Sequence, residues 1–325
     1  MKDLHALPKP LVAFAVDPGG QAQPLTLPED GSLPDVASGY VWLHFDLNDP
    51  LLKPWLDAVA PEIPATALLQ SETRPRADVV ENDLILQLRG VNLNPGQDPD
   101  DMVSVRLWVQ ERLIVSARKR KVLAVDAIRQ RLASGTGPTT VSAFLADLTY
   151  GLTKRIEEVS LDLVEATDAL EESALHPNRE TAADLADLRQ SVIKLRRFVR
   201  PQCAAIVDLA DGSLWPLEPT QASLLNETAN RATRLLEEFD ATADRLKALQ
   251  EYMDMVQNSV LGRNSYVLSV VAAIFLPLGF LTGLLGVNVG GIPGVDAPYG
   301  FAVVTIGSAV IGLILFFVFR ALKWL

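Results

Sequence analysis

YVLSVVAAIFLPLGFLTGLL at Tyr266–Leu285 and FAVVTIGSAVIGLILFFVF at Phe301–Phe319 are the two stretches that decide the fold. Neither contains a charged residue, and each has about the 20 residues that a helix needs to cross a hydrocarbon core of roughly 30 Å. The connection, GVNVGGIPGVDAPYG, is short. The sequence therefore predicts a transmembrane domain over 266–325, with spans at 266–285 and 301–319, an outer loop at 286–300 and a short end at 320–325.

Basic residues at the ends of the spans predict their orientation. Arg263 precedes the first span, Arg320 and Lys323 follow the second, and the loop contains no Lys or Arg. Because cytoplasmic flanks carry the excess of basic residues, we expect both termini in the cytoplasm and the loop outside. The N-terminal region has no secretory signal, which also favours a cytoplasmic location for the large polar part.

Composition excludes several classes of function. The chain has 325 residues and a net charge of −11, which argues against nucleic acid as a partner. The single cysteine and three histidines lie outside the spans, and no pair has metal-ligand spacing, so we assign no metal site and expect no resident cofactor. No nucleophile elbow or phosphate loop is present, and we expect no enzyme activity.

Residues 1–140 have the pattern of an α/β domain, in which Pro- and Gly-rich loops separate the predicted strands and helix. The two-residue gap at Gln110 and Glu111 predicts a hairpin. The predicted strands and helix are Leu11–Val16, Tyr40–Leu47, Asp83–Val91, Val103–Val109, Arg112–Ala117 and, as a helix, Val122–Ala133.

Residues 141–265 are predicted to form a helical layer and stalk. Apolar residues recur at three and four positions from about Val141, and His176–Asn178 interrupts the pattern. A second helix is expected to end near Pro201. From Thr220 to Leu285 no signal stops a third helix, which would be on the order of 100 Å long and would run into the first span.

A seam of apolar residues follows the third helix with alternating spacings of four and three, interrupted only by Thr242. Such a long helix must pack its seam against the two preceding helices or against copies of itself. The rod is either a passive stalk or a lever that moves the span. The seam comprises Leu235, Phe239, Thr242, Leu246, Leu249, Met253, Val256 and Val260.

A conducting pore would need several copies of the chain, because two spans cannot enclose one. The first span is the better pore lining, since it continues the stalk and is rich in small or polar residues, while the second is expected to face lipid. Close helix packing explains the small residues equally well. The candidate lining is Leu276, Gly279, Thr282 and Gly283, with Leu276 a candidate hydrophobic gate.

Further candidate residues lie at both ends of the first span. Gly286, Val287 and Asn288 would form the outer mouth, where a ring of Asn288 amide oxygens could bind the water shell of a cation. Asp296 would add negative charge there or be a solvated loop residue. Glu251 and Asp254 form either a cytoplasmic entry ring or a solvated helix face.

FLPLGFLTGLLGVNVGGIPG, at Phe275–Gly294, closely resembles the CorA family of divalent-cation transporters. The matching features are two C-terminal spans, a Gly-x-Asn signature after the first, Pro277 one helix length earlier, a short outer loop and the basic-aromatic end of Arg320, Lys323 and Trp324. The resemblance implies a homopentameric funnel in the bacterial inner membrane, with an α+β cytoplasmic domain and long stalk helices.

Val287 at the centre of the signature, followed by GGIPG, is similar to the zinc-transporting branch called ZntB rather than to the magnesium and cobalt branch, which typically has Met there. This implies Zn²⁺ as the transported ion, with proton coupling and the direction of transport left open. Two alternatives stay open: a Mg²⁺ or Co²⁺ channel of the same family, and a membrane-anchored scaffold or sensor that conducts nothing.

Overall fold

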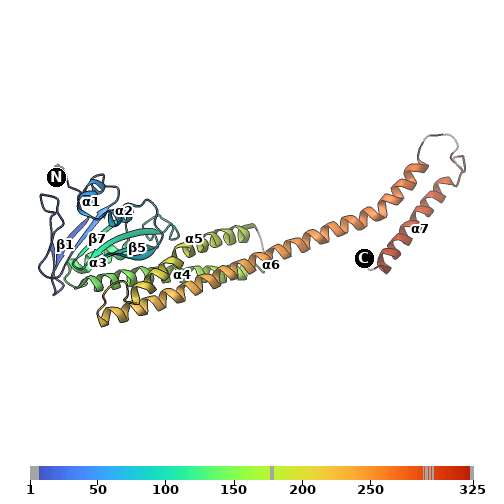
Figure 1. Cartoon of the computed structure of the whole chain (residues 1–325). Helices are drawn as coiled ribbons and strands as arrows, with labels where there is room; N and C mark the ends of the chain where they lie inside the picture. The colour runs from blue at the N-terminus through green and yellow to red at the C-terminus, as the bar shows by residue number, and fades with distance from the viewer. Residues whose placement is uncertain are drawn as a thin grey trace. The chain divides into compact units, whose positions relative to one another are not determined.

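The computed structural model describes residues 7–175, 179–287, 289, 292, 294 and 296–322 of the chain. These residues divide into two compact units, Met1–Leu249 and Gln250–Leu325. The first contains a sheet and a layer of helices, and the second contains the two apolar helical segments (Figure 1). One helix, α6, contributes residues to both units.

The first unit is built on a seven-stranded sheet with the order β2-β1-β3-β7-β6-β5-β4, in which only β3 and β7 are parallel neighbours. All five predicted strands are confirmed. The sequence missed β2 and β4, because both are short, exposed edge strands with little apolar alternation. The strands are β1 Val12–Val16, β2 Ala22–Pro24, β3 Tyr40–Asp46, β4 Arg76–Val80, β5 Asp83–Gly90, β6 Val103–Gln110 and β7 Leu113–Arg118.

The predicted hairpin is confirmed between β6 and β7, with its turn one residue later than expected. Gln110 pairs with Leu113 in the antiparallel ladder, so Glu111 and Arg112 form the turn. The strand therefore extends by one polar residue beyond its apolar run. Gln110 Nε2 donates to the carboxylate of Asp83 on β5, which holds that end of β6 in the sheet.

Helices cover both faces of the sheet (Figure 1). The short helices α1, Leu52–Val59, and α2, Glu62–Leu69, pack on one face, where Trp55 is fully buried. The other face packs against α3, Leu123–Ala133, and the start of α4, Val141–Ser173. Alternating side chains of each strand therefore enter two separate apolar cores, which explains the near-continuous apolar runs of the central strands.

Three long helices, α4, α5 (Arg179–Ala210) and α6 (Pro219–Leu285), form the helical layer and confirm the three predicted helices. The break between the first two is confirmed by the helix ends, although His176–Asn178 themselves lie outside the described residues. Arg245 of α6 is held by Asp168 and Glu171 of α4, at 2.5 and 2.7 Å.

The apolar seam of α6 is buried within the first unit and exposed beyond it. Leu246 is fully buried and Leu249 is 8 % exposed, whereas Val260 is 53 % exposed. The preceding helices thus cover the first part of the seam, which was one of the two expected modes of packing. Within the described single chain, nothing covers the seam at Val260.

The second helix does not end near Pro201, as the sequence predicted, but continues through it to Ala210. Proline inside a helix removes one backbone hydrogen bond and costs about 3 kcal/mol. The residues after Pro201 are part of the main core: Ile206 and Leu209 are almost fully buried. Burying such side chains is worth about 1.5–3 kcal/mol each, which offsets the cost of the proline.

The second unit holds the end of α6 and the helix α7, Gly300–Ala321. Both are long and apolar enough to cross a membrane, with mean hydropathy of 2.3 and 2.6 over their most apolar windows. The first predicted span forms the end of α6, and the second lies within α7. Their apolar side chains are mostly exposed in the single chain, as expected for surfaces that face lipid or other copies.

Candidate functional site

The candidate site is the side of α6 that lies away from α7. A Cβ placed on Gly312 of α7 would lie 3.7 Å from Leu278 Cδ1, so the Leu278 side of α6 faces α7. At 3.6 residues per turn, Leu276, Gly279 and Gly283 fall on the opposite side of the helix. The structure therefore brings three of the four predicted lining residues to one face that α7 leaves uncovered.

Open space surrounds this face. Leu276 is 70 % exposed, and a Cβ built on Gly279 or on Gly283 would meet no atom within 4 Å. The two glycines are therefore not required for packing within the single chain. Small residues here leave room for a second helix or for a passage along the helix.

Thr282, the fourth predicted lining residue, lies one turn after Leu278 and therefore on the side of α6 that faces α7. Its hydroxyl donates to the backbone carbonyls of Leu278 and Gly279, at 2.9 and 3.3 Å. Earlier in the same helix, Pro277 has no N–H and leaves the carbonyl of Ala273 without its helical partner. The helix continues through Pro277 all the same.

The helix ends where the predicted signature begins. The N–H of Gly286 donates to the carbonyls of Thr282 and Gly283, at 3.0 and 3.2 Å. A Cβ on Gly286 would lie 3.1 Å from the Thr282 carbonyl oxygen, so a larger residue would disturb this ending. Val287 is 47 % exposed, and Asn288 lies outside the described residues.

Acidic candidates lie on both sides of the apolar segment. Asp296 is exposed in a turn of the loop between α6 and α7. Glu251 and Asp254 are exposed on α6, before the apolar segment begins. Their spacing of three residues puts them on one side of the helix.

The sequence reasoning missed that these positions belong to one stripe. Polar or small residues recur at steps of three, four or seven along α6, and at 3.6 residues per turn they share the side that carries Leu276 and Gly283. All are exposed in the single chain. The stripe comprises Glu251, Asp254, Asn258, Ser265, Ser269, Ala272, Leu276, Gly279 and Gly283. The spacing can be read from the sequence, but only the structure shows that this side of α6 lies away from α7.

No tight metal site accompanies the stripe. Among the described residues, no three His, Cys, Asp or Glu side chains come together as ligands. His44 is buried in the sheet, with Nδ1 2.8 Å from Ser116 Oγ. Burial, and then the nearby Arg118, lowers the pKa of His44 to about 3, so it is neutral at physiological pH.

Comparisons with known proteins show which family the chain resembles and which fold it shares. Residues 37–321 match the family described as "CorA-like Mg2+ transporter protein". The divalent cation transporter CmaX of Pseudomonas aeruginosa is 37 % identical over 88 % of this chain and 87 % of its own. The zinc transport protein ZntB of Pectobacterium atrosepticum is 36 % identical over 80 % of both chains. The solved structure of full-length CmaX superposes with a TM-score of 0.80, covering 98 % of this chain and 99 % of its own at 33 % identity.

Proposed function

This chain belongs to the CorA-like Mg2+ transporter family, whose members carry divalent cations, and we propose that it forms a homopentameric pore for Zn²⁺ along the stripe of α6. The observation that carries the proposal is the position of Leu276, Gly279 and Gly283 on the side opposite α7, in open space. Five such faces around an axis would enclose a passage, with the α7 helices outside against lipid.

The chemistry of the stripe suits a cation that keeps its water. Its polar members are carboxylates, an amide and hydroxyls, and hard oxygen donors of this kind bind a hydrated ion without replacing its whole shell. Glu251 and Asp254 would concentrate cations at one end, and Asp296 at the other. The outer mouth of the passage would be formed by Gly286, Val287 and Asn288, which follow the first span.

The proposal that Zn²⁺ is the transported ion is based on similarity to a zinc transport protein and not on a set of zinc ligands in this chain. ZntB of P. atrosepticum, at 36 % identity, is a zinc transport protein, and CmaX is named only as a divalent cation transporter. Without His or Cys in the spans, the passage lacks the ligands that hold Zn²⁺ tightly. We therefore expect Zn²⁺ to pass partly hydrated and selectivity over similar ions to be modest.

We also propose that the large N-terminal unit and both chain ends lie in the cytoplasm of a bacterium, with the protein in the inner membrane. The flanking Arg263 and Arg320 support this orientation through the positive-inside rule. Glu251 and Asp254 would then lie at the cytoplasmic entrance, and Asp296 at the outer mouth.

The test is ion flux into proteoliposomes that contain the full-length protein and a trapped Zn²⁺ indicator. We expect Zn²⁺ influx that depends on the protein and falls at least about tenfold in Asn288→Ala, because each copy loses its amide at the mouth. A Mg²⁺ or Co²⁺ channel would carry those ions freely while Zn²⁺ stays outside. A non-conducting scaffold would show no flux of any of the three, in the wild type or in the variant.

The same vesicles test proton coupling. Between Tyr266 and Phe319 the only ionisable carboxylate is Asp296 in the loop, so the spans hold no carboxylate or histidine that could relay a proton. We therefore expect an imposed pH gradient to leave initial Zn²⁺ flux unchanged at constant membrane potential. A several-fold change would mean that residues outside the spans couple the two ions.

A further inference from the structure

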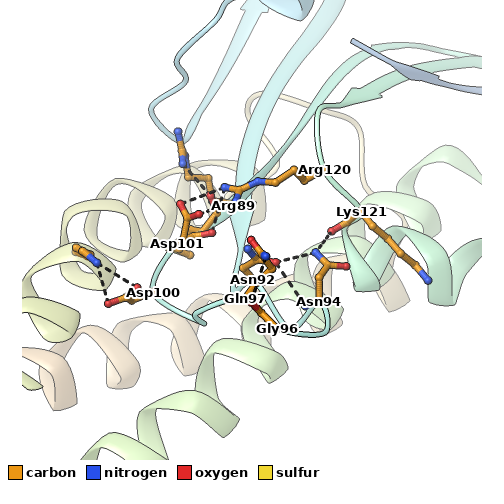
Figure 2. Close-up of polar contacts among 11 residues, drawn as sticks. Arg89, Asn92, Asn94, Gly96, Gln97, Asp100, Asp101, Arg120 and Lys121 are labelled. Carbon is orange, nitrogen blue, oxygen red and sulfur yellow. Dashed lines mark hydrogen bonds and ion pairs between the residues drawn. The ribbon is translucent and has the colours of Figure 1, made fainter. Parts of the chain in front are cut away.

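A second polar site lies far along the chain from the spans, inside the N-terminal unit. The segment before β4, the loop between β5 and β6, and helix α5 enclose a cavity of about 660 Å³. Figure 2 shows Arg89 of β5 near this loop, with Asp100 and Asp101 on it. The size is that of a small-molecule site.

Arg89 is positioned in the cavity by groups that do not neutralise it. Its Nε and Nη2 donate to the carbonyl of Thr73, at 3.1 and 3.0 Å, and its Nη1 donates to the carbonyl of Met102, at 3.1 Å. The guanidinium lies 3.9 Å from the ring centre of Phe198. A guanidinium has five N–H donors, so two stay available for a ligand within the described part of the chain.

Thr73 supplies a second unused donor. Its side chain lines the cavity and is 4 % exposed, yet the hydroxyl has no hydrogen-bond partner among the described residues. A buried hydroxyl without a partner costs about 1–3 kcal/mol. A ligand oxygen in the cavity would remove that cost.

The acidic residues of the cavity wall are already engaged. Asp101 accepts two hydrogen bonds from Arg120, at 2.6 and 3.1 Å (Figure 2). Asp100 accepts from Ser191, at 2.7 Å, and pairs with Lys194, at 3.3 Å. These carboxylates therefore form their hydrogen bonds and ion pairs with Arg120, Ser191 and Lys194 rather than with Arg89, although Asp101 and Glu72 still attract its charge.

The remaining charge of the cavity is positive. Arg74 and Arg197 line it, are exposed, and form no ion pair within the described residues. The exposed carboxylates of the lining are those of Glu72 and of Asp101, and Asp101 is paired with Arg120. Burial, followed by repulsion from Arg197, lowers the pKa of Arg89. The buried Arg106 of β6, which does not line the cavity, has no partner for Nε and Nη1 among the described residues.

We propose that this cavity binds a phosphate group, either inorganic phosphate or the phosphate of a small phosphorylated metabolite. Three guanidinium groups and a hydroxyl offer more donors than the two oxygens of a carboxylate can accept, and they match a dianion with three or four oxygens. The volume leaves room for the rest of a small molecule. A bound phosphate would join β5, through Arg89, and the segment before β4, through Thr73, to α5, through Arg197.

The experiment is calorimetric titration of the purified full-length protein in detergent, free of divalent metal ions, with inorganic phosphate and with glycerol phosphate. Potassium chloride at the same ionic strength is the reference. We expect one saturable site per chain for phosphate and none for chloride. Tighter binding of glycerol phosphate would identify a phosphorylated metabolite, and equal or weaker binding would identify inorganic phosphate.

Three variants separate binding from folding. Thr73→Val removes a hydroxyl that has no hydrogen-bond partner in the described part of the chain, so the unfolding temperature without phosphate should not fall, while phosphate affinity should fall about tenfold. Arg74→Ala combined with Arg197→Ala should weaken binding at least as much. Arg234→Ala is the control for charge, because Arg234 is exposed on α6, pairs with Glu227 at 3.6 Å and does not line the cavity, so it should leave affinity unchanged.

The proposal is overturned by any of three results. The first is the absence of saturable heat for both phosphate probes. The second is an equal response to chloride. The third is wild-type affinity in the double arginine variant.

Discussion

At the scale of single residues, the glycines on the open side of α6 offer the sharpest test of the pathway. A Cβ on Gly283 meets nothing within 4 Å in the single chain, and the same is true of Gly307 on α7. We expect Gly283→Leu to reduce Zn²⁺ flux in proteoliposomes at least about tenfold, because the side chain would enter the proposed passage.

Gly307→Leu is the matched control, since it makes the same change on a helix that is proposed to face lipid. It should leave flux within about twofold of wild type. Equal loss in both variants would mean that the glycines serve helix packing instead.

His44 makes stability depend on pH through its burial. Its pKa is about 3 in the folded protein and about 6.5 when unfolded, so below pH 6.5 the unfolded state binds the extra proton. The contribution of His44 to the free energy of unfolding is complete above pH 6.5. It falls by up to about 1.4 kcal/mol per pH unit as the pH decreases toward 3.

We therefore expect the unfolding temperature of the wild type to fall more steeply between pH 6.5 and 4.5 than that of His44→Gln. Circular dichroism in detergent measures both curves. The carboxylates titrate alike in the two proteins, so their difference isolates His44. Parallel curves would contradict the assignment.

At the scale of elements, α6 passes from a buried to an exposed environment. Leu246 is fully buried against the helices of the first unit, whereas Met255, outside the seam, is 66 % exposed in the single chain. Removing buried methyl groups of leucine costs about 2–5 kcal/mol. Leu246→Ala should therefore lower the unfolding temperature by several degrees, and Met255→Ala should leave it nearly unchanged. Equal shifts would mean that Leu246 and Met255 are buried alike.

At the scale of the whole molecule, the exposed apolar surface requires partners. The helices of the second unit are almost wholly uncovered in the single chain, including the seam at Val260. We expect native mass spectrometry from detergent to give five copies of the 35.3 kDa chain. Val260→Asp should release smaller species, because it puts a charge into the proposed contact between copies. A stable monomer or dimer of the wild type would remove the basis for a pore.

Much of this architecture could be predicted from residue patterns. Uncharged runs such as Tyr266–Leu285 predict spans because their length matches the hydrocarbon core of a bilayer, and the period of the α6 seam predicts a helix over its whole length. The edge strands β2 and β4 could not be found, because their stability comes from pairing with a neighbour rather than from their own pattern. The prediction that a helix ends near Pro201 was wrong for a similar reason. Burial of the residues after Pro201 in the core outweighs the local cost of a proline inside a helix.

By itself, the sequence determined the membrane hairpin, the long helix and the family, since charge, hydropathy and period are local properties of the chain. It also supplied Leu276, Gly279 and Gly283 as candidates, with packing as an equal alternative. Only the tertiary structure decided which side of α6 meets α7, and so which residues stay open. It alone brought Thr73, Arg89 and Arg197 to one cavity, because such contacts join segments that no local pattern connects.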